Sequence, residues 1–328
     1  MRPDPKAEID GYLARLGMER PARPDVAWLF AAHRAHMERI PYENFEIQLG
    51  RPTSVDPVEA IGRIARGRGG YCFHLNGALG TLLACLGYDV TRHLGEVRGA
   101  ADDQQATTLT VNHQVLTVLC EGEAWLVDTG LGDAPYEPMP LRTGSVTQGP
   151  FTYRLEPWVR NQSSWWGSAG RRRPGSPGRG WRFVHDPRAE SLVSMVFAAE
   201  PVAVSAFAEA HLRLSTSPES AFVRNAVASR RDALGADVLR GRMFYRVDGA
   251  GVSKQYVETP GAWFALLADV FGLHFPDAGA SADASGRYGV RGRLWARVSE
   301  AHERWLADRE QAATAASSGV SEASSSTA

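Results

Sequence analysis

Cysteine carries a strong nucleophile, and one of the three cysteines stands where that chemistry would be used. Cys72 follows Arg68-Gly-Gly-Tyr71 and begins a segment that is predicted to be helical. The two glycines allow a close backbone approach, and a helix N-terminus favours negative charge. A free thiol with a pKa of ~8.5 is about 3% thiolate at pH 7, and a helix N-terminus with a histidine partner lowers that pKa to about 7 or below. These features favour Cys72 as a nucleophile.

The competing interpretation is that Cys72 is a small buried hydrophobic residue, as free cysteines usually are. Cys85 and Cys120 fit that interpretation, because one lies in a leucine-rich helical segment and the other in an apolar strand. We therefore expect Cys85 and Cys120 to be core residues. For Cys72, the residues around it leave both interpretations open.

A thiol nucleophile needs a base, and the sequence offers nine histidines. His74 lies two residues after Cys72, about 200° around a helix, so it is predicted to point away from the thiol. His33 and His36 are three residues apart, a spacing that can bind a metal ion, but no acidic or cysteine cluster accompanies them. We therefore expect both to be surface residues. His113 is the better base, because it begins an apolar strand that a hairpin turn follows.

The register of that hairpin decides whether an acid reaches His113. With a two-residue turn, Cys120 pairs with Glu123. His113 then faces Gly130, and Asp128 is its diagonal neighbour on the same face, within side-chain reach. A turn that begins one residue earlier sets His113 opposite Asp128 directly, whereas a three-residue loop would place the two on opposite faces.

Asp128 closes an otherwise apolar strand. As an orienting acid it would hold the tautomer of His113 and stabilise the imidazolium, which is the role of the carboxylate in catalytic triads. The alternative is a turn-forming residue at the end of a strand. The chain order Cys72, His113, Asp128 is that of thiol-dependent acyl transfer, although unrelated proteins contain such a trio by chance.

The elements that must position these residues follow from hydrophobic periodicity. Helical spacing predominates up to about residue 95, and Gly87 suits the position after the helix that Cys72 begins. Strands are predicted from about 88 to 190, and a mixture follows from 191 to about 280. The predicted helices are Glu8–Leu16, Asp25–Arg39, Val58–Arg66, Cys72–Leu86, Pro218–Leu234, Trp263–Phe271 and a last one around Leu294–Trp305, and the predicted strands are Tyr88–Leu94, Gln114–Cys120, Ala124–Asp128, Thr152–Val159, Met243–Val247 and Ser253–Glu258.

Two segments have a different composition. Asn161–Trp181 is rich in arginine, glycine and proline, and we interpret it as a flexible surface insertion rather than as an anion-binding loop. After Arg309 the chain is rich in Ala, Ser and Thr, and it is predicted to be a disordered tail.

The composition excludes several classes of protein. The 328 residues carry 36 Lys and Arg against 37 Asp and Glu, a formal net charge of −1, which argues against nucleic acid or an anionic membrane as the main partner. No apolar stretch reaches the roughly 18 residues of a membrane span, and the first residues lack the apolar core of a secretory signal. Three cysteines are too few for a disulfide framework. We expect a cytoplasmic globular protein.

The chain resembles the arylamine N-acetyltransferase family from about residue 8 to 308, and the matching segments occur in the same order as in the family. The segments that carry the resemblance are Arg68–Asn76 for the active-site cysteine, His36–Asn44 for the first domain, Asn112-His113 for the catalytic histidine, Val127–Gly132 for the aspartate, and Leu214–Phe222 and Phe271–Leu273 for the third domain.

The resemblance implies an α+β fold built from a helical bundle, a β-barrel and an α/β lid around a papain-like core. It implies a catalytic triad of Cys72, His113 and Asp128 at the junction of the first two domains. The corresponding boundaries are 1–95 for the helical bundle with the nucleophile, 96–190 for the β-barrel with the histidine and aspartate, 191–280 for the α/β lid, 281–310 for a C-terminal helix and 311–328 for the disordered tail.

The resemblance also implies a ping-pong reaction of xenobiotic metabolism. Acetyl-CoA acetylates Cys72, CoA leaves, and an arylamine or hydrazine takes the acetyl group, with no metal involved. His113 would deprotonate the attacking amine, and the backbone N–H of Cys72 is our candidate donor to the oxyanion. Gly130 and Gly132 are candidates for contact with the pantetheine arm of CoA, or simple turn glycines.

The chain departs from the family pattern at three positions. His74 stands where the family usually has an acid, Asn112 stands where it has Thr or Ser, and Arg213 stands where a Tyr is often found. These departures concern acceptor preference and cofactor contacts and leave the triad intact. Two other functions stay open: an amide synthase that acts on a polyketide-type acyl chain with the same triad, and a non-catalytic binding module.

Overall fold

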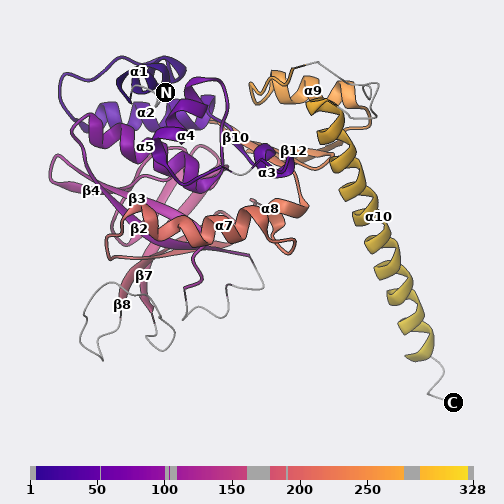
Figure 1. Ribbon diagram of the computed structural model, residues 1–328. Helices are drawn as coiled ribbons and strands as arrows, with labels where there is room; N and C mark the ends of the chain where they lie inside the picture. The colour runs from indigo at the N-terminus through magenta and orange to yellow at the C-terminus, as the bar shows by residue number, and fades with distance from the viewer. Residues whose placement is uncertain are drawn as a thin grey trace.

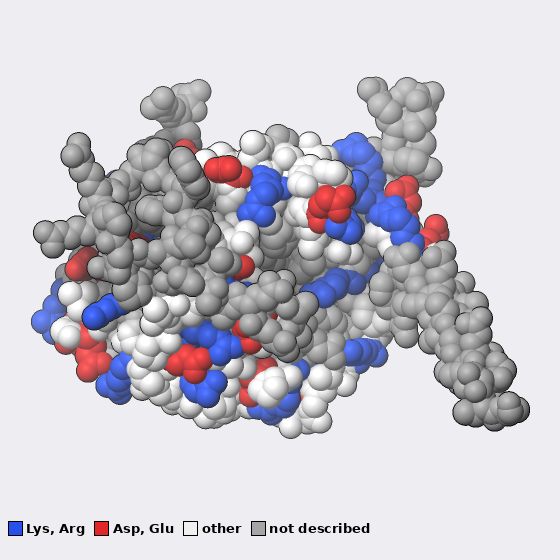
Figure 2. Space-filling model, turned by 90° about the horizontal axis from the view of Figure 1, so that it is seen from below, with Lys and Arg blue, Asp and Glu red and all other residues white. Residues whose placement is uncertain are grey.

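The structure is a computed structural model, and it describes residues 5–51, 53–99, 103, 109–160, 178–189, 191–276 and 289–323. Its helices and strands form three parts, which Figure 1 shows as N-terminal helices, a large sheet beneath them, and a smaller sheet with its own helices. In the face shown in Figure 2, basic and acidic side chains alternate over the described surface, as the near-zero net charge leads one to expect.

The N-terminal helices pack around a core of leucines. Asp25 and Asp56 cap two of these helices by accepting hydrogen bonds from the backbone N–H groups of Trp28 and Val58. Most of α5, the last of these helices, is buried, and its leucines lie in one hydrophobic core with apolar residues of α1 and α4. The helices are α1 (Pro5–Leu16), α2 (Val26–Arg39), α3 (Phe45–Gln48), α4 (Pro57–Ala65) and α5 (Cys72–Cys85).

An eight-stranded antiparallel sheet curves beneath the helices like a barrel (Figure 1). Its strand order is β5-β4-β3-β2-β9-β8-β7-β6, so neighbours in sequence are mostly neighbours in space. The strands are β2 (Asp89–Arg98), β3 (His113–Cys120), β4 (Glu123–Leu126), β5 (Met139–Pro140), β6 (Gly144–Gln148), β7 (Phe151–Arg160), β8 (Gly178–Val184) and β9 (Ser194–Ala198).

A five-stranded antiparallel sheet forms the third part, and its first strand comes from the N-terminal region. Tyr42 pairs with Ser229 on one side and forms a bridge to Gly70 on the other, so this strand ties the third part to the segment before α5. The elements are β1 (Tyr42–Glu43), η2 (Val204–Phe207), α7 (Ala208–Thr216), α8 (Ala221–Arg224), β10 (Val227–Arg231), β11 (Gly235–Arg240), β12 (Met243–Asp248), β13 (Gly251–Tyr256), α9 (Pro260–Asp269) and α10 (Val290–Ala323).

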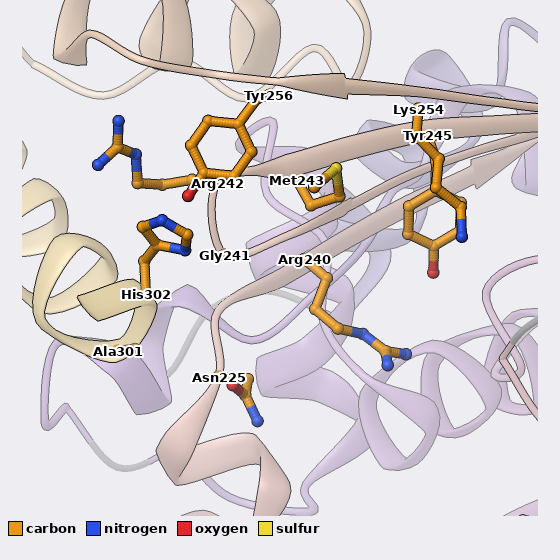
Figure 3. Close-up of a pocket in the computed structure, with 10 residues that line it drawn as sticks. All are labelled: Asn225, Arg240, Gly241, Arg242, Met243, Tyr245, Lys254, Tyr256, Ala301 and His302. Carbon is orange, nitrogen blue, oxygen red and sulfur yellow. The ribbon is translucent and has the colours of Figure 1, made fainter. Parts of the chain in front are cut away.

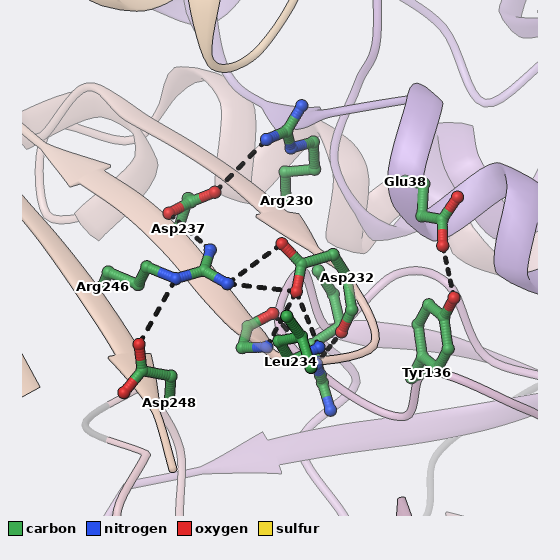
Figure 4. Close-up of polar contacts among 10 residues, drawn as sticks. Glu38, Tyr136, Arg230, Asp232, Leu234, Asp237, Arg246 and Asp248 are labelled. Carbon is green, nitrogen blue, oxygen red and sulfur yellow. Dashed lines mark hydrogen bonds and ion pairs between the residues drawn. The ribbon is translucent and has the colours of Figure 1, made fainter. Parts of the chain in front are cut away.

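Arginine side chains brace the five-stranded sheet and join it to the barrel. Arg231 is fully buried, donates to the carbonyl oxygen of Gln148 at 3.1 Å and lies 4.6 Å from the ring centre of Phe151. Such a contact lets the negative face of an aromatic ring stabilise a buried cation in place of a carboxylate. Arg246 on β12 binds three carboxylates (Figure 4): that of Asp237 on β11, that of Asp232 between β10 and β11, and that of Asp248 at the end of β12 itself.

The α+β class is confirmed, and so is the existence of most predicted elements, which begin and end within a few residues of the expected positions. The predicted helix Pro218–Leu234 is wrong. The structure has only the short helix α8 there, followed by strand β10. Helical periodicity misled because Val227, Ala228 and Ser229 pair with β11 in the sheet, and pairing with partners distant in sequence overrides local preference.

The expectation that His33 and His36 are surface histidines is also wrong, since both are fully buried. Their Nδ1 atoms lie 3.0 Å from the carbonyl oxygen of Tyr136 and 2.7 Å from the hydroxyl of Tyr12. Burial lowers the pKa of His33 to about 4 and that of His36 to about 3, so both rings are neutral near pH 7.

Cys120 is buried as expected, but Cys85 is exposed, because it occupies the last turn of α5 and faces away from the leucine core. Cys85 was therefore wrongly assigned to the core. The N-terminal half of α5 points into the protein, which leaves Cys72 as its buried cysteine.

Three boundaries differ from the expected domains. Strand β9 lies in the segment 191–280, yet it belongs to the eight-stranded sheet between β2 and β8. Residues 178–181 of the expected insertion are part of strand β8, and 161–177 lie outside the described residues. Helix α10 continues through Ala323, into the tail expected to be disordered, because alanine is the strongest helix former.

Among the described helices, none combines the length and the apolar character that crossing a bilayer requires.

Candidate active site

Cys72 is the first residue of α5. The buried carboxylate of Glu43 binds the segment that precedes Cys72. The side chain of Cys72 is buried. Glu43 accepts a hydrogen bond from the backbone N–H of Gly69 at 3.3 Å and pairs with Arg68, also at 3.3 Å. The backbone N–H of Glu43 donates to the carbonyl oxygen of Gly70 at 2.9 Å. These contacts position the start of α5, and the thiol with it.

Glycines allow this segment to pack tightly. A Cβ atom at Gly69 would collide with the carbonyl oxygen of Pro41, which is backbone and cannot turn aside. A Cβ atom at Gly130 would lie 2.8 Å from the Cα atom of Cys72 and 2.9 Å from the side-chain nitrogen of Asn76. Gly130 therefore lets the loop after β4 lie directly against the nucleophile.

His113 and Asp128 are joined by a hydrogen bond of 2.7 Å between Nε2 and Oδ2, and both side chains are almost completely buried. The hairpin has the first of the registers considered above, with Cys120 opposite Glu123. Its two turn residues have positive φ, which is typical of a tight two-residue turn. The structure thus confirms the register of the two-residue turn and the contact of His113 with Asp128, although the paired part of β3 and β4 ends at Thr117 and Leu126.

The charges around His113 favour its protonated form. Burial lowers the pKa of His113. The charges of Asp128 and Cys72 and their hydrogen bonds to the ring raise it by more, so that the net pKa is about 10. Because Nε2 of His113 faces Asp128, Nδ1 is the atom left for Cys72. The thiol also lies 3.6 Å from the carbonyl oxygen of Asn112. An imidazolium beside a cysteine is the environment that stabilises a thiolate.

Asn76 is a component of the site that sequence reasoning missed. Its amide nitrogen donates to Oδ1 of Asp128 at 2.7 Å and to the carbonyl oxygen of Gln114 at 2.6 Å. Its carbonyl oxygen accepts from the backbone N–H of Thr129 at 2.9 Å. The available signal was spacing, since residues four apart share one face of a helix and Asn76 follows Cys72 by four. Asn76 fastens the helix that carries the thiol to the acid.

Asp128 is saturated with donors. Oδ2 receives the bond from His113, and Oδ1 receives bonds from Asn76 and from the backbone N–H of Gly130 at 2.9 Å. A buried carboxylate with such partners is fixed in orientation. The thiol of Cys72, the imidazole of His113 and the carboxylate of Asp128 therefore form one connected buried group.

The sequence as a whole matches a model of one protein family. The model described as N-acetyltransferase covers residues 25–279. The chain belongs to the N-acetyltransferase family. The matched range contains the segment before Cys72, the hairpin with His113 and Asp128, and the whole five-stranded sheet.

Individual members of the N-acetyltransferase family show the same likeness. The chain is 39% identical over 147 residues to arylamine N-acetyltransferase of Mycolicibacterium smegmatis, an alignment that spans 43% of this chain and 53% of that protein. It is 31% identical over 153 residues to proansamycin X synthase of Amycolatopsis mediterranei, which spans 45% of this chain and 58% of that protein. The chain thus aligns with little more than half the length of these two relatives.

A solved structure extends the comparison to nearly the full chain. The arylamine N-acetyltransferase of Mycobacterium marinum in complex with CoA has a TM-score of 0.72 and 27% identity, and the match covers 89% of this chain and 99% of that one. The fold of this chain is therefore that of the solved family members.

The structure shows what surrounds each of the three residues at which this chain departs from the family pattern. His74 is buried, and its Nε2 lies 3.0 Å from the hydroxyl of Thr53 rather than at the thiol. The side chain of Asn112 exchanges two hydrogen bonds with the backbone of Val97. Arg213 donates to the carbonyl oxygen of Val111 at 2.7 Å, next to the residue whose carbonyl meets the thiol.

The two glycines predicted to contact CoA have packing roles in this structure. Gly132 has a positive φ of 85°, and a Cβ atom there would collide with the hydroxyl of Ser229. At Gly130, Cys72 and Asn76 occupy the space that a side chain would need. Contact of Gly130 or Gly132 with CoA stays a prediction. Among the residues that the structure describes, no group of three or more His, Cys, Asp or Glu side chains is placed to hold a metal ion.

The tight fit at Gly130 leads to a prediction about stability. Gly130→Ala is expected to destabilise the protein by about 1–3 kcal/mol, because the added methyl group must displace the backbone at Cys72. The measurement is the midpoint of chemical unfolding followed by circular dichroism. Gly261→Ala is the control, because nothing lies within 4 Å of a Cβ atom there. Equal midpoints for the two variants would contradict the packing role of Gly130.

Proposed function

We propose that this protein is an arylamine N-acetyltransferase that carries the acetyl group of acetyl-CoA on Cys72. The observation that supports this most strongly is the buried connection of Cys72, His113 and Asp128, with the pKa of His113 raised to about 10. The family membership and the likeness to a structure in complex with CoA support the choice of acetyl-CoA as donor.

In the first half-reaction, the thiolate of Cys72 attacks the carbonyl carbon of acetyl-CoA. The carbon–sulfur bond to CoA breaks, and the departing thiolate takes the proton of the His113 imidazolium. The backbone N–H of Cys72, at the start of α5, is our candidate donor to the tetrahedral oxyanion, because the first N–H groups of a helix have no partner within it. The products are free CoA and an acetyl thioester on Cys72.

In the second half-reaction, an amine attacks the thioester carbon. Neutral His113 takes the proton of the amine as the carbon–nitrogen bond forms, and Cys72 leaves as the thiolate. Asp128 holds the imidazole in place through both halves and is hydrogen-bonded throughout. The enzyme returns to its starting state, and the net change is transfer of one acetyl group to nitrogen.

The acceptor is an arylamine or a hydrazine. Tyr71, Phe73 and Phe207 pack with Cys72 in one hydrophobic cluster, and Phe222 adds a ring 5.1 Å from that of Tyr71. Aromatic walls suit an aromatic amine. The curated relatives named arylamine N-acetyltransferase support the same acceptor class. We place the protein in the cytoplasm, with small molecules rather than nucleic acid or a membrane as its partners.

The test is a matrix of acyl-CoA donors against amine acceptors. We expect one equivalent of CoA to be released per active site from acetyl-CoA before any amine is added, and steady turnover after an arylamine or hydrazine is added. Acetyl-CoA hydrolysis at the same rate with and without amine would contradict the transferase assignment.

The alternative is an amide synthase that uses the same triad on a polyketide-type acyl chain. The relative named proansamycin X synthase is the observation that favours it. In the same matrix, a preference for long acyl thioesters over acetyl-CoA by a factor of about ten or more would support this alternative and exclude acetyl transfer as the main activity.

A further inference from the structure

Helix α7 contacts both of the elements that carry Cys72 and His113 (Figure 1). His211 of α7 is hydrogen-bonded to the hydroxyl of Tyr71, the residue that directly precedes Cys72. Two residues further along α7, Arg213 donates to the carbonyl oxygen of Val111 at 2.7 Å, just before β3 begins. One helix is therefore bound to the start of α5 on one side and to the start of β3 on the other.

The contact with α5 belongs to a chain of buried hydrogen bonds that begins and ends at the first turn of that helix. From Tyr71 the chain passes to His211, whose Nε2 lies 2.7 Å from the carbonyl oxygen of Thr53. The hydroxyl of Thr53 lies 3.0 Å from Nε2 of His74, which returns the chain to α5. Tyr71, His74 and His211 are all buried. The chain thus closes around Cys72, which stands between Tyr71 and His74 in the sequence.

The acceptors in this chain determine where its protons lie. A backbone carbonyl can only accept, so Nε2 of His211 carries a hydrogen toward Thr53. In the neutral ring Nδ1 is then an acceptor, and the hydroxyl of Tyr71 donates to it. Burial, together with the charge of Arg63 and the neighbouring His211, lowers the pKa of His74, so that this ring is neutral near pH 7. The hydroxyl of Tyr71 is therefore held in one direction, toward α7.

Aromatic packing supports the same contact from both sides of Cys72. The ring of Tyr71 lies 5.8 Å from that of His211. The ring of Phe73 lies 5.5 Å from that of Phe207, the residue directly before α7. Cys72, its two neighbours and Phe207 belong to one hydrophobic cluster. The two residues that flank the thiol in the sequence thus both pack against α7 or its first turn.

The contact with β3 lies one residue away from the backbone group that the thiol meets. Arg213 binds the carbonyl oxygen of Val111, and the carbonyl oxygen of Asn112 lies 3.6 Å from Sγ of Cys72. The Cα atoms of two such consecutive residues are about 3.8 Å apart. Arg213 therefore holds the stretch of backbone that leads into His113. Its side chain is exposed, so this bond can be removed without opening the core.

The separation of α5 and β3 decides which charge the thiol meets. His113 supplies a positive charge, because its pKa is raised to about 10, and Asp128 binds the far side of that ring. Burial and the charge of Cys72 raise the pKa of Tyr42 and of Tyr71, so both phenols are neutral near pH 7. Coulomb attraction falls with distance, so a thiolate at neutral pH depends on how close His113 stays to Cys72.

We propose that His211 and Arg213 are positioning residues of the nucleophile, through which α7 holds the start of α5 and the start of β3 at the separation where Sγ of Cys72 meets the imidazole of His113. The proposal rests on the proposed function, because it concerns the thiol chemistry of Cys72. His211 acts through Tyr71, and Arg213 acts through the backbone at Val111.

The test measures the rate at which iodoacetamide labels Cys72 at pH 7 and at pH 10. All proteins carry Cys85→Ala, because the exposed thiol of Cys85 would react as well. The ratio of the two rates reports the thiolate present at pH 7, since an unassisted thiol is only about 3% thiolate there but mostly thiolate at pH 10. A change in solvent access alters both rates alike and leaves the ratio unchanged.

The parent protein should give a ratio within about threefold of one, because an imidazolium stabilises the thiolate of Cys72 at both pH values. Arg213→Gln and His211→Phe should each lower the ratio about 3- to 10-fold, since a thiol that moves away from His113 loses part of that stabilisation. Release of CoA from acetyl-CoA before any amine is added should slow by a similar factor at pH 7.

Three further variants separate positioning from a general loss of structure. Glu209→Gln changes an exposed charge on the same helix and should alter the ratio less than about twofold. His211→Gln retains an amide donor for the carbonyl of Thr53 and should restore part of the ratio. Tyr71→Phe added to His211→Phe should have no further effect, because the bond between the two side chains is already lost. Circular dichroism establishes that each variant is folded.

The outcomes distinguish this proposal from the proposed function. A folded Arg213→Gln variant with the ratio of the parent protein would overturn the role of α7, even if the parent acetylates amines well. A ratio that depends on His211 and Arg213 in a protein that transfers no acetyl group would overturn the proposed function and leave the positioning role. A parent ratio of about 0.03, that of an unassisted thiol, would overturn both.

Discussion

Replacement of Cys72 by alanine is expected to abolish acetyl transfer, with a loss of about 10⁴-fold or more in kcat/KM. The substitution removes the sulfur that we propose carries the acyl group, while His113 and Asp128 keep their hydrogen bond. The decisive measurement is the release of CoA from acetyl-CoA in the absence of amine, together with the mass of the protein afterwards. Wild type should gain one acetyl group, and Cys72→Ala should gain none.

Cys85→Ala is the matched control for this experiment. Cys85 lies at the other end of the same helix and is exposed, so its removal leaves the buried group untouched. It should show the full release of CoA and the full acetyl adduct. A full adduct on Cys72→Ala would show that another residue carries the acyl group. Similar circular dichroism for the two variants would show that loss of fold does not explain the result.

Asp128→Asn is expected to lower kcat/KM roughly 10³- to 10⁴-fold although the side chain keeps its shape. Two of the donors that face this carboxylate, Asn76 and the N–H of Gly130, share one oxygen, and His113 faces the other. An amide cannot accept from all of them, and the imidazole loses the charge that fixes it. The pKa of His113 should then fall, because burial lowers it and Asp128 no longer raises it.

The pH dependence of this variant follows from the same pKa. In the folded protein the pKa of His113 is raised to about 10, above its ordinary value of 6.5. The stabilisation from its charge is therefore fully present below pH 6.5 and is lost as the pH rises through about 10. The difference in Tm between wild type and Asp128→Asn should be largest below pH 6.5 and should shrink toward pH 10.

A second readout reports on the thiol itself. Labelling of Cys72 by iodoacetamide at neutral pH should be slower in Asp128→Asn, because a less basic His113 retains less of the positive charge that favours the thiolate. Asp133→Asn is the control, since Asp133 is a buried acid of the same loop that faces His185 at 3.4 Å instead of the triad. Equal labelling rates in wild type and Asp128→Asn would contradict the role of Asp128.

The parts of the site that could be predicted from the sequence are those held by local geometry. A two-residue turn sets the register of its hairpin, so the relation of His113 to Asp128 followed from counting residues along β3 and β4. The position of Cys72 at a helix start followed from the glycines before it and the leucines after it. Both inferences need only neighbours in the chain.

The failures share the opposite property. Strand β1 has two residues and exists because Tyr42 pairs with Ser229, which lies more than half the chain length away in sequence. His33 and His36 read as surface residues until α2 is packed against Tyr12 and Tyr136. Whether a side chain is buried depends on what its helix packs against. The sequence of α2 shows only that positions 33 and 36 are polar.

The sequence by itself indicated the trio Cys72, His113 and Asp128 and gave the observed hairpin register as one of three alternatives, because helix starts and hairpins are local. The tertiary structure decided that Asn76 ties the helix of Cys72 to Asp128, since that bond joins two elements across the core. It also decided that α10 meets β12 and β13 around a cavity with basic side chains in its lining (Figure 3). Contacts between distant segments depend on how whole layers pack, and the spacing of residues along one chain carries no record of that packing.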